Sequence, residues 1–386
     1  MKKWRDWVFP IVVGILCVGL AFVPDMVNTE YGNLPRVRAK ILSVDNTRLY
    51  PVGIAYSGAQ TCEVEILSGE HRGETLSATN YMNTALDKDK LYEAGDTTWA
   101  MLREDAGGAP NVTLVDHYRL GTEALLFGLF ALLLILFGGA TGLGALISLV
   151  ASVMVTWKLL IPLLLRGVPP IWAALGLVIA LTAIIMVLVA GFSRLAWVAT
   201  AGSFAGTLLT CILSIVFGNM MKLDGGTLSY AVPLISQSTM TFDLRELFFA
   251  MVFIANSGAL MDLSMDISSA CREITVHNPG ISRRKLLKSG FVVGRNVIGT
   301  MTTTLLLAYS GSYLSMMAYF AGQGTPPVDL FNLKYVASEI LITLVGSFGL
   351  VTVAPFTAVI AALAWGGKVE NGENAEGAVL GPPTTR

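Results

Sequence analysis

Residues 170–190 read PIWAALGLVIALTAIIMVLVA, a run without a single charged side chain. An α-helix rises about 1.5 Å per residue, so roughly 20 apolar residues cross the hydrocarbon core of a bilayer, which is about 30 Å thick. The run has this length, and it therefore predicts a helix that spans a membrane.

Apolar runs of similar length lie on both sides of this stretch. Together they predict eight spans, at residues 7–24, 122–138, 140–165, 170–190, 194–218, 246–270, 289–320 and 335–365. The third and seventh runs are longer than a bilayer requires. We expect these two helices to bend or break, the third at Pro162 and the seventh at Gly311.

The composition agrees with a membrane protein. Of the 386 residues, 54% are hydrophobic and only 14% are charged, whereas soluble chains carry about 25% charged residues. The mean hydropathy is +0.64. The net charge of −1 supplies no basic field for nucleic acid, so no nucleic-acid partner is expected. Charged residues gather between positions 25 and 120, which predicts an α-helical polytopic membrane protein with one soluble insert.

The insert is rich in β-forming residues. Five short runs with turn residues between them predict strands at 37–44, 62–67, 74–79, 97–102 and 111–115. Five strands in about 80 residues suit a small barrel of the OB or SH3 kind. Such a domain either binds a ligand or acts as a rigid docking module, and the sequence leaves both roles open.

Lysine and arginine set the expected orientation, because cytoplasmic loops carry an excess of both. They gather at the N-terminus and in the loop 271–288. We therefore expect residues 1–24 to be a membrane anchor with a cytoplasmic N-terminus. No small-x-small site follows this segment, which favours an anchor over a cleaved signal peptide. The insert, 25–120, is then extracytoplasmic, 121–366 form a seven-helix domain, and 367–386 form a disordered cytoplasmic tail.

Enzymatic chemistry finds little support in the sequence. All three histidines lie outside the predicted spans, which argues against an intramembrane Ser–His dyad, and no HExxH zinc motif or P-loop is present. The four cysteines have no metal-ligand spacing. We therefore expect no enzyme, no cofactor and no metal site.

Polar residues inside the last three spans are the candidate functional residues. An ionisable side chain at mid-membrane costs about 2.5–3.5 kcal/mol even on gentle scales, so it marks a functional site by default. The candidates are Asn256, Asp262, Asp266, Arg295, Asn296, Thr300, Thr303 and Glu339.

Asp262 and Arg295 are the central pair of this hypothesis. Counted from the basic loop, both lie roughly 9–13 Å into the membrane, on consecutive antiparallel helices. We expect them to face each other, with Asp266 one turn nearer water. The pair either fixes the helix packing or forms a proton or cation relay. The hydroxyls near Thr300 either join helices or line a path outward, and Glu339 is its outer carboxylate or an interfacial residue.

Several motifs resemble the YibE/F-like family of bacterial multipass membrane proteins. They are GALMD at 258–262, GRNVIGTMT at 294–302, LAYSG at 307–311, VGSFGL at 345–350 and LSGEHRGET at 67–75. The resemblance implies a permease-like protein of the bacterial cytoplasmic membrane. It also implies an aspartate and an asparagine where this chain has Asn296 and Thr303, and a small polar residue where it has Asp266.

From these observations we expect a permease-like secondary transporter of an ion or small solute. Its pathway would use the polar residues of the last three helices, and its partners would be the lipid bilayer and that solute. Proton coupling and a homo-oligomer remain open. The alternative is a non-transporting scaffold or receptor whose outer β domain docks a partner and whose Asp–Arg pair is structural.

Overall fold

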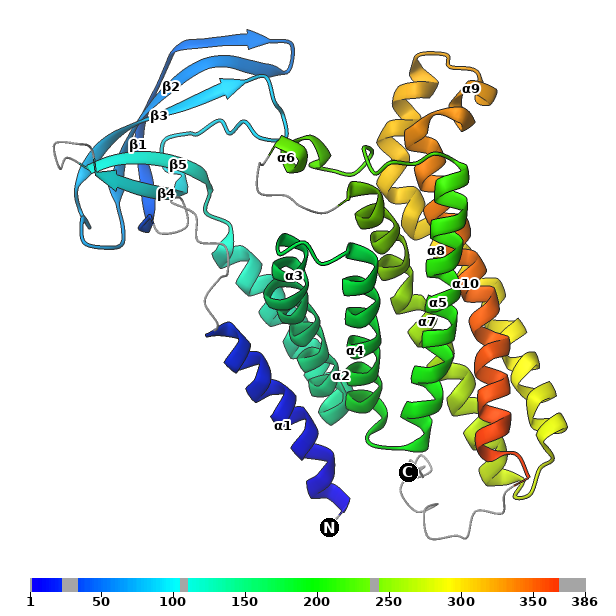
Figure 1. The fold of residues 1–386 in the computed structure, drawn as a ribbon. Coiled ribbons are helices and arrows are strands. Elements are labelled where there is room, and N and C mark those ends of the chain that lie inside the picture. The colour runs from blue at the N-terminus through cyan, green and yellow to red at the C-terminus, as the bar shows by residue number, and fades with distance from the viewer. Residues whose placement is uncertain (1, 23–33, 105–109, 237–242, 368–386) are drawn as a thin grey trace, which may run out of the picture. The chain divides into compact units, whose positions relative to one another are not determined.

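The computed structural model describes residues 2–22, 34–104, 110–236 and 243–367. The chain divides into two compact units (Figure 1). One comprises Asp25–Leu136, and the other comprises Met1–Pro24 together with Phe137–Arg386. The tail expected at 367–386 lies, apart from Gly367, outside the described residues.

The first unit contains a nearly closed antiparallel sheet. Its strands are β1 (Arg36–Val52), β2 (Ala55–Ile66), β3 (Thr75–Asn83), β4 (Thr97–Glu104) and β5 (Pro110–His117). The strand order is β3-β2-β1-β4-β5. The two edge strands, β3 and β5, also lie against each other, which gives the sheet its barrel-like form. All five predicted strands are thus confirmed.

Strand β1 is longer than the sequence predicts. It continues past Val44 to Val52, where Gly53, at φ 63°, turns the chain into β2. Only glycine adopts this left-handed conformation without strain. Small and β-branched residues alternate into the interior, and Ile41, Val64 and Ile66 are fully buried there. The charged and polar residues of 45–48 hid this hairpin from a pattern search for apolar residues.

The second unit is helical, and the first unit also includes the beginning of helix α2, up to Leu136. The helices are α1 (Lys2–Ala21), α2 (Leu120–Val155), η2 (Thr156–Leu160), α3 (Ile161–Leu165), α4 (Pro170–Ala190), α5 (Arg194–Met220), α6 (Ala231–Ser236), α7 (Leu244–His277), α8 (Arg283–Gly322), α9 (Pro327–Asn332) and α10 (Lys334–Trp365). Seven stretches of the described residues are long and apolar enough to cross a membrane. They match the second to eighth predicted spans. The apolar part of α1, Pro10–Ala21, is shorter, so an eighth span stays a prediction.

The two expected helix irregularities have opposite outcomes. The helix preceding Pro162 widens into a single π-helical turn, η2, as a disturbance at this proline would require. No break occurs at Gly311, because α8 runs from Arg283 to Gly322 as one helix. That prediction was wrong. A glycine removes no hydrogen bond, so it weakens a helix without ending it. The non-helical residue in α2 is Gly139, with φ 53° and ψ −127°, at the boundary that the sequence predicts between the second and third spans.

Helices α5, α7 and α10 pack together along lines of small residues. At four positions a side chain larger than hydrogen would overlap a neighbouring helix, so the backbones approach closely. The contacts are Gly202 with Thr357, Gly206 with Val353, Gly346 with Asn256 and Gly349 with Thr210. The largest buried cluster lies beside this seam and includes Leu260, Leu263 and Leu350.

Candidate functional site

A cavity of about 340 Å³, open to the surface on one side, lies between α8, α9 and α10. Its lining is mostly apolar and aromatic, with two hydroxyls, those of Tyr313 and Thr343, and one carboxylate. The lining residues are Leu306, Tyr313, Met316, Met317, Phe331, Val336, Glu339, Ile340, Thr343 and Leu344. The volume falls in the range of small-molecule sites, which typically combine apolar walls with a few polar groups.

Glu339 is the ionisable group of this cavity. It lies on the same face of α10 as Val336 and Thr343, three and four residues away, because those spacings bring side chains to one side of a helix. Its side chain is half-buried, and among the described residues it has no hydrogen bond or ion pair. A carboxylate in apolar surroundings is therefore available to a bound proton or cation.

A partly buried hydrogen bond joins α7 to α8 close to the cavity. Tyr309 donates from its hydroxyl to Oδ1 of Asn256, at 2.9 Å. The Asn256 side chain is 1% exposed, and its Nδ2 donates to the carbonyl of Val252 at 2.7 Å. Tyr309 lies one turn from Tyr313, which lines the cavity. Asn256 was a candidate from the sequence, whereas Tyr309 was not, although an amide at this depth requires a partner.

Buried hydroxyls form a further polar group in the helical unit. Ser203 and Thr207 on α5 and Ser268 on α7 have no hydrogen-bond partner among the described residues. Ser264 and Thr357 lie 3.3 Å apart, oxygen to oxygen, across the seam between α7 and α10. The sequence analysis did not select these residues, because serine and threonine are common in packed membrane helices.

The structure does not form the expected Asp262–Arg295 pair. Asp262, Asp266 and Arg295 are all exposed, and the described part of the chain contains no ion pair among them. Gly294 packs near Ile267, so Arg295 lies near the level of Asp266, one turn from that of Asp262. A count of residues from the basic loop could not predict the direction in which each side chain leaves its helix, and the structure forms no pair between these charges.

The remaining candidates on α8 are also exposed. Thr300 and Thr303 donate to carbonyls of their own helix, those of Val297 at 3.0 Å and Gly299 at 3.3 Å. Asn296 is exposed beside Arg295. Only 6% of the most apolar stretch of α8 is buried, against 56% in α7. The α8 candidates therefore do not line an enclosed path within one chain.

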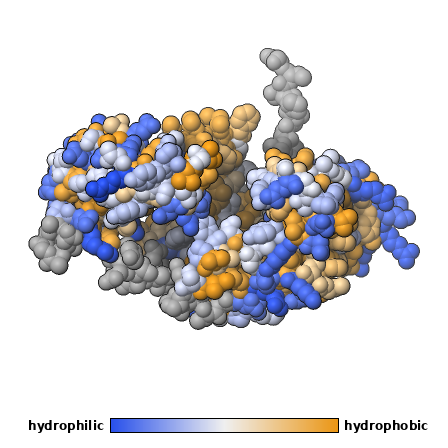
Figure 2. Space-filling view, turned by 90° about the horizontal axis from the view of Figure 1, so that it is seen from above, coloured by the Kyte–Doolittle hydropathy of each residue, from blue (hydrophilic) through white to orange (hydrophobic). Residues whose placement is uncertain are grey.

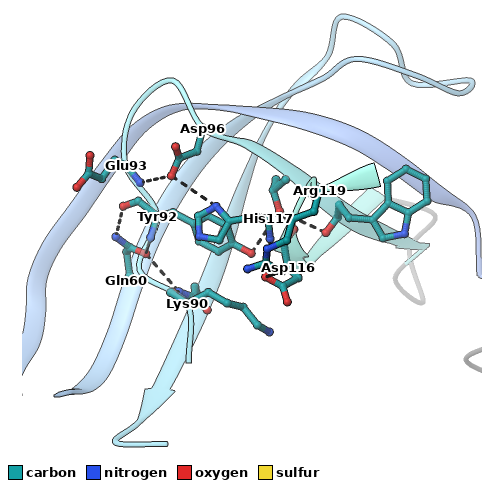
Figure 3. Close-up of polar contacts among 11 residues, drawn as sticks. Gln60, Lys90, Tyr92, Glu93, Asp96, Asp116, His117 and Arg119 are labelled. Atoms are coloured by element: carbon teal, nitrogen blue, oxygen red, sulfur yellow. Dashed lines mark hydrogen bonds and ion pairs between the residues drawn. The ribbon is translucent and has the colours of Figure 1, made fainter. Parts of the chain in front are cut away.

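A polar cluster fixes the segment between β3 and β4 in the barrel (Figure 3). Gln60 donates to the carbonyl of Tyr92 at 2.8 Å and accepts from its N–H at 3.1 Å. His117 lies 3.8 Å from a carboxylate oxygen of Asp96 and 4.8 Å, ring to ring, from Tyr92. Burial raises the pKa of the Tyr92 phenol above its usual value. The cluster is thus a packed structural element whose tyrosine stays neutral.

Just beyond the cluster, Asp116 pairs with Arg119 at 3.0 Å, immediately before α2 begins. Burial by itself would raise the pKa of Asp116. The hydrogen bonds from the Arg119 guanidinium and the His117 N–H outweigh this effect and lower it. Asp116 is therefore ionised at neutral pH.

One end of the barrel exposes large apolar side chains. The tip of the β1–β2 hairpin and the end of β3 contribute them, and their exposed fractions are Tyr50 65%, Val52 53%, Ile54 86%, Tyr56 38%, Tyr81 70% and Leu86 65%. Thr84 donates its N–H to the carbonyl of Tyr56, which holds the two segments together. We call this group the hairpin tip. Figure 2 shows further hydrophobic residues interspersed with hydrophilic ones on the face of the molecule seen from above.

Comparison with known proteins adds a family. A family model described as YibE/F-like protein matches residues 126–366, which is more than half of the chain. No curated protein matches the chain, and no solved structure does. Among the described residues, no group of three or more histidine, cysteine, aspartate or glutamate side chains could hold a metal ion.

Proposed function

We propose that this chain, which belongs to the YibE/F-like family, is a permease-like secondary transporter of an ion or small solute. The observation that carries the proposal is the cavity between α8 and α10 with the unpaired carboxylate of Glu339. A half-buried carboxylate in a membrane-spanning helix is costly, and such residues mark substrate or ion pathways. The cavity provides a place for a solute, and Glu339 provides the charge that selects it.

The proposed pathway continues from the cavity toward the other polar residues. Tyr309 and Asn256 connect the cavity to the interior of α7 by their hydrogen bond. Asp262, Asp266 and Arg295, with Asn296, Thr300 and Thr303, would form its cytoplasmic half only where a second surface encloses them, because all six are exposed in the single chain. Proton coupling follows from the chemistry of Glu339, because a proton and a cationic solute would compete for the same carboxylate.

The proposal places the protein in the bacterial cytoplasmic membrane. Both termini would be cytoplasmic, α1 would be an eighth span, and residues 25–120 would be extracytoplasmic. The excess of lysine and arginine in the loop around 278–288 supports this orientation. The strand order β3-β2-β1-β4-β5, with β3 against β5, supports a barrel of the OB kind. We propose no enzymatic activity and no cofactor.

Flux measurements on Glu339 variants test the proposal. The protein is reconstituted into vesicles that contain a pH-sensitive dye and carry a pH gradient. Metal cations, amines and carboxylates are then added in turn, and solute-dependent proton movement is recorded. Glu339→Gln should abolish the flux seen with the wild type. Glu273→Gln, at the exposed end of α7, is the matched control and should retain it. Undiminished flux in Glu339→Gln would refute the assignment.

The hairpin tip favours a second candidate, a scaffold or receptor that docks a partner through the barrel. Patches of exposed aromatic and aliphatic residues mark interaction sites, and tyrosine is enriched in them. If this function is correct, Ile54→Ser combined with Tyr81→Ser should abolish crosslinking of the barrel to its partner in cells. The control, Thr75→Ala at the other end of β3, should not. In this case, the transport assay should record no solute-dependent proton movement for any of the solutes added.

A further inference from the structure

Three unlike charges are exposed on one side of the helical unit. Asp262 and Asp266 lie on a narrow exposed stripe of α7, one turn apart, and Arg295 lies on the neighbouring helix α8. Gly294 packs near Ile267, so Arg295 lies near the level of Asp266, and Asp262 lies one turn farther along α7. They belong to stretches that are long and apolar enough to cross a membrane. A single chain would therefore present them to hydrocarbon.

Exposure of these charges to lipid is unfavourable, so another surface must cover them. The first half of α2, Leu120–Gly139, is the one long apolar stretch outside the helical unit. Its only charged residue is Glu123, in its first turn. That helix has no groups that would neutralise two aspartates and an arginine at this depth. The surface that covers them must carry both signs of charge.

A second copy of the same chain carries both. In a two-fold dimer each contact occurs twice, with residue i of one copy against residue j of the other and the reverse. Arg295 of one copy can then pair with Asp262 and Asp266 of the other, and the reciprocal contact uses the same residues. The arginine and the aspartates have opposite charge and do not pair within their own chain, as this arrangement requires.

Small residues next to the charges permit close approach. Gly258 lies one turn from Asp262 on α7, and Gly299 lies one turn from Arg295 on α8. Both glycines face open space, since an added side-chain carbon would meet nothing within 4 Å. Helices in membranes associate through such positions, where polar residues add hydrogen bonds between helices.

We propose that this protein forms a homodimer through the exposed faces of α7 and α8, held by two reciprocal contacts between Arg295 and the Asp262–Asp266 pair. This proposal is independent of the proposed transport function. It rests on the exposed charges of α7 and α8, whereas the transport proposal rests on the cavity at Glu339. It also gives the three charged candidates a role that a single chain does not offer them.

The mass of the protein in lipid nanodiscs is the first test. The wild type should have twice the chain mass of 41.2 kDa. Arg295→Glu should be monomeric, because a glutamate would then oppose the aspartates. Asp262→Lys combined with Asp266→Lys should be monomeric for the converse reason. The milder Arg295→Gln should raise the dissociation constant at least tenfold, and Lys222→Glu, an exposed charge reversal elsewhere, should leave the dimer intact.

Coexpression of the two charge-reversed chains, with different tags, gives the decisive result. A heterodimer of the two has attractive contacts at both positions, so the tags should copurify in a 1:1 complex. A pair formed within one chain would not be restored between two chains. Three results would overturn the proposal. They are a monomeric wild type, a dimer formed by either reversed chain alone, and failure of the mixed chains to associate although each elutes as a folded monomer. If a reversed chain does not fold, the wild-type mass and Arg295→Gln still decide.

Discussion

The hydroxyl of Tyr309 on α8 donates a 2.9 Å hydrogen bond to Oδ1 of Asn256, which is buried on α7. This bond joins a poorly buried helix to the packed interior. Hydrogen bonds between membrane helices contribute about 0.6 kcal/mol on average and up to about 1.7. Tyr309→Phe should therefore lower the free energy of unfolding by an amount in this range, since it leaves the amide oxygen without its donor.

Unfolding in mixed detergent micelles measures this difference. Tyr335→Phe is the control, because Tyr335 is 56% exposed and its hydroxyl can bond to water. A loss equal in both variants would mean that the Tyr309–Asn256 bond adds nothing to stability.

Gly346→Ala should be more damaging than the loss of that hydrogen bond. A methyl group at Gly346 would overlap the side-chain amide of Asn256, which is itself held by its hydrogen bond to the carbonyl of Val252. Overpacking of a tight core costs about 1–3 kcal/mol. Gly176→Ala on α4, where an added carbon meets nothing within 4 Å, should be neutral or slightly stabilising in the same thermal unfolding assay. Equal stability of the two variants would contradict the close packing described here.

The thiol of Cys62 should be unreactive in the folded barrel. Burial raises its pKa to about 11, so at pH 8 only about one thiol in a thousand is ionised, and the thiolate is the reactive form. Maleimide labelling of this position should be negligible at neutral pH in the native protein, and it should rise with pH and on denaturation. Mass spectrometry of tryptic peptides reports the site. Rapid native labelling would show that the barrel opens.

The ion pair between Asp224 and Lys334 ties the loop after α5 to the start of α10. The hydrogen bond from Lys334, and then that from the Gly226 N–H, lower the pKa of Asp224. A carboxylate whose folded pKa is lowered stabilises the fold above its unfolded value of about 3.9, and this stability is lost as the pH falls through the folded value.

Asp224→Asn should therefore be less stable than the wild type at neutral pH, and the two should converge below about pH 4. Both side chains are largely exposed, at 44% and 56%, so the difference should not exceed about 1 kcal/mol. Melting temperatures across the pH range measure it. Asp329→Asn, exposed on α9, is expected to follow the wild-type curve.

The sequence predicted the elements of this fold better than their contacts. Runs such as 170–190 are apolar throughout, so their length alone identifies a spanning helix, and α4 occupies that range. The five strands were found because β-forming residues alternate between turn clusters. The hairpin from Asp45 to Thr61 was missed, since the charged and polar residues 45–48 interrupt the apolar pattern of its first strand.

The candidate site was predicted in part. Asn256 and Glu339 were selected because polar groups are costly in a membrane, and the structure gives each a defined environment. Asp262 and Arg295 were selected for the same reason, yet their contacts depend on the rotation of each helix about its axis. The hydropathy of α7 and α8 differs little from one side of the helix to the other, so it contains no information on that rotation.

The glycine contacts that lock α10 to α5 and α7 have a mechanical consequence. Side-chain atoms of one helix, three of them oxygens, lie against bare backbone of the next at Gly202, Gly206, Gly346 and Gly349. Sliding or twisting any of the three helices would drive these atoms together, so the trio must move as one body. Any alternation between inward-open and outward-open states therefore has to displace α8 and its neighbours around a fixed three-helix block.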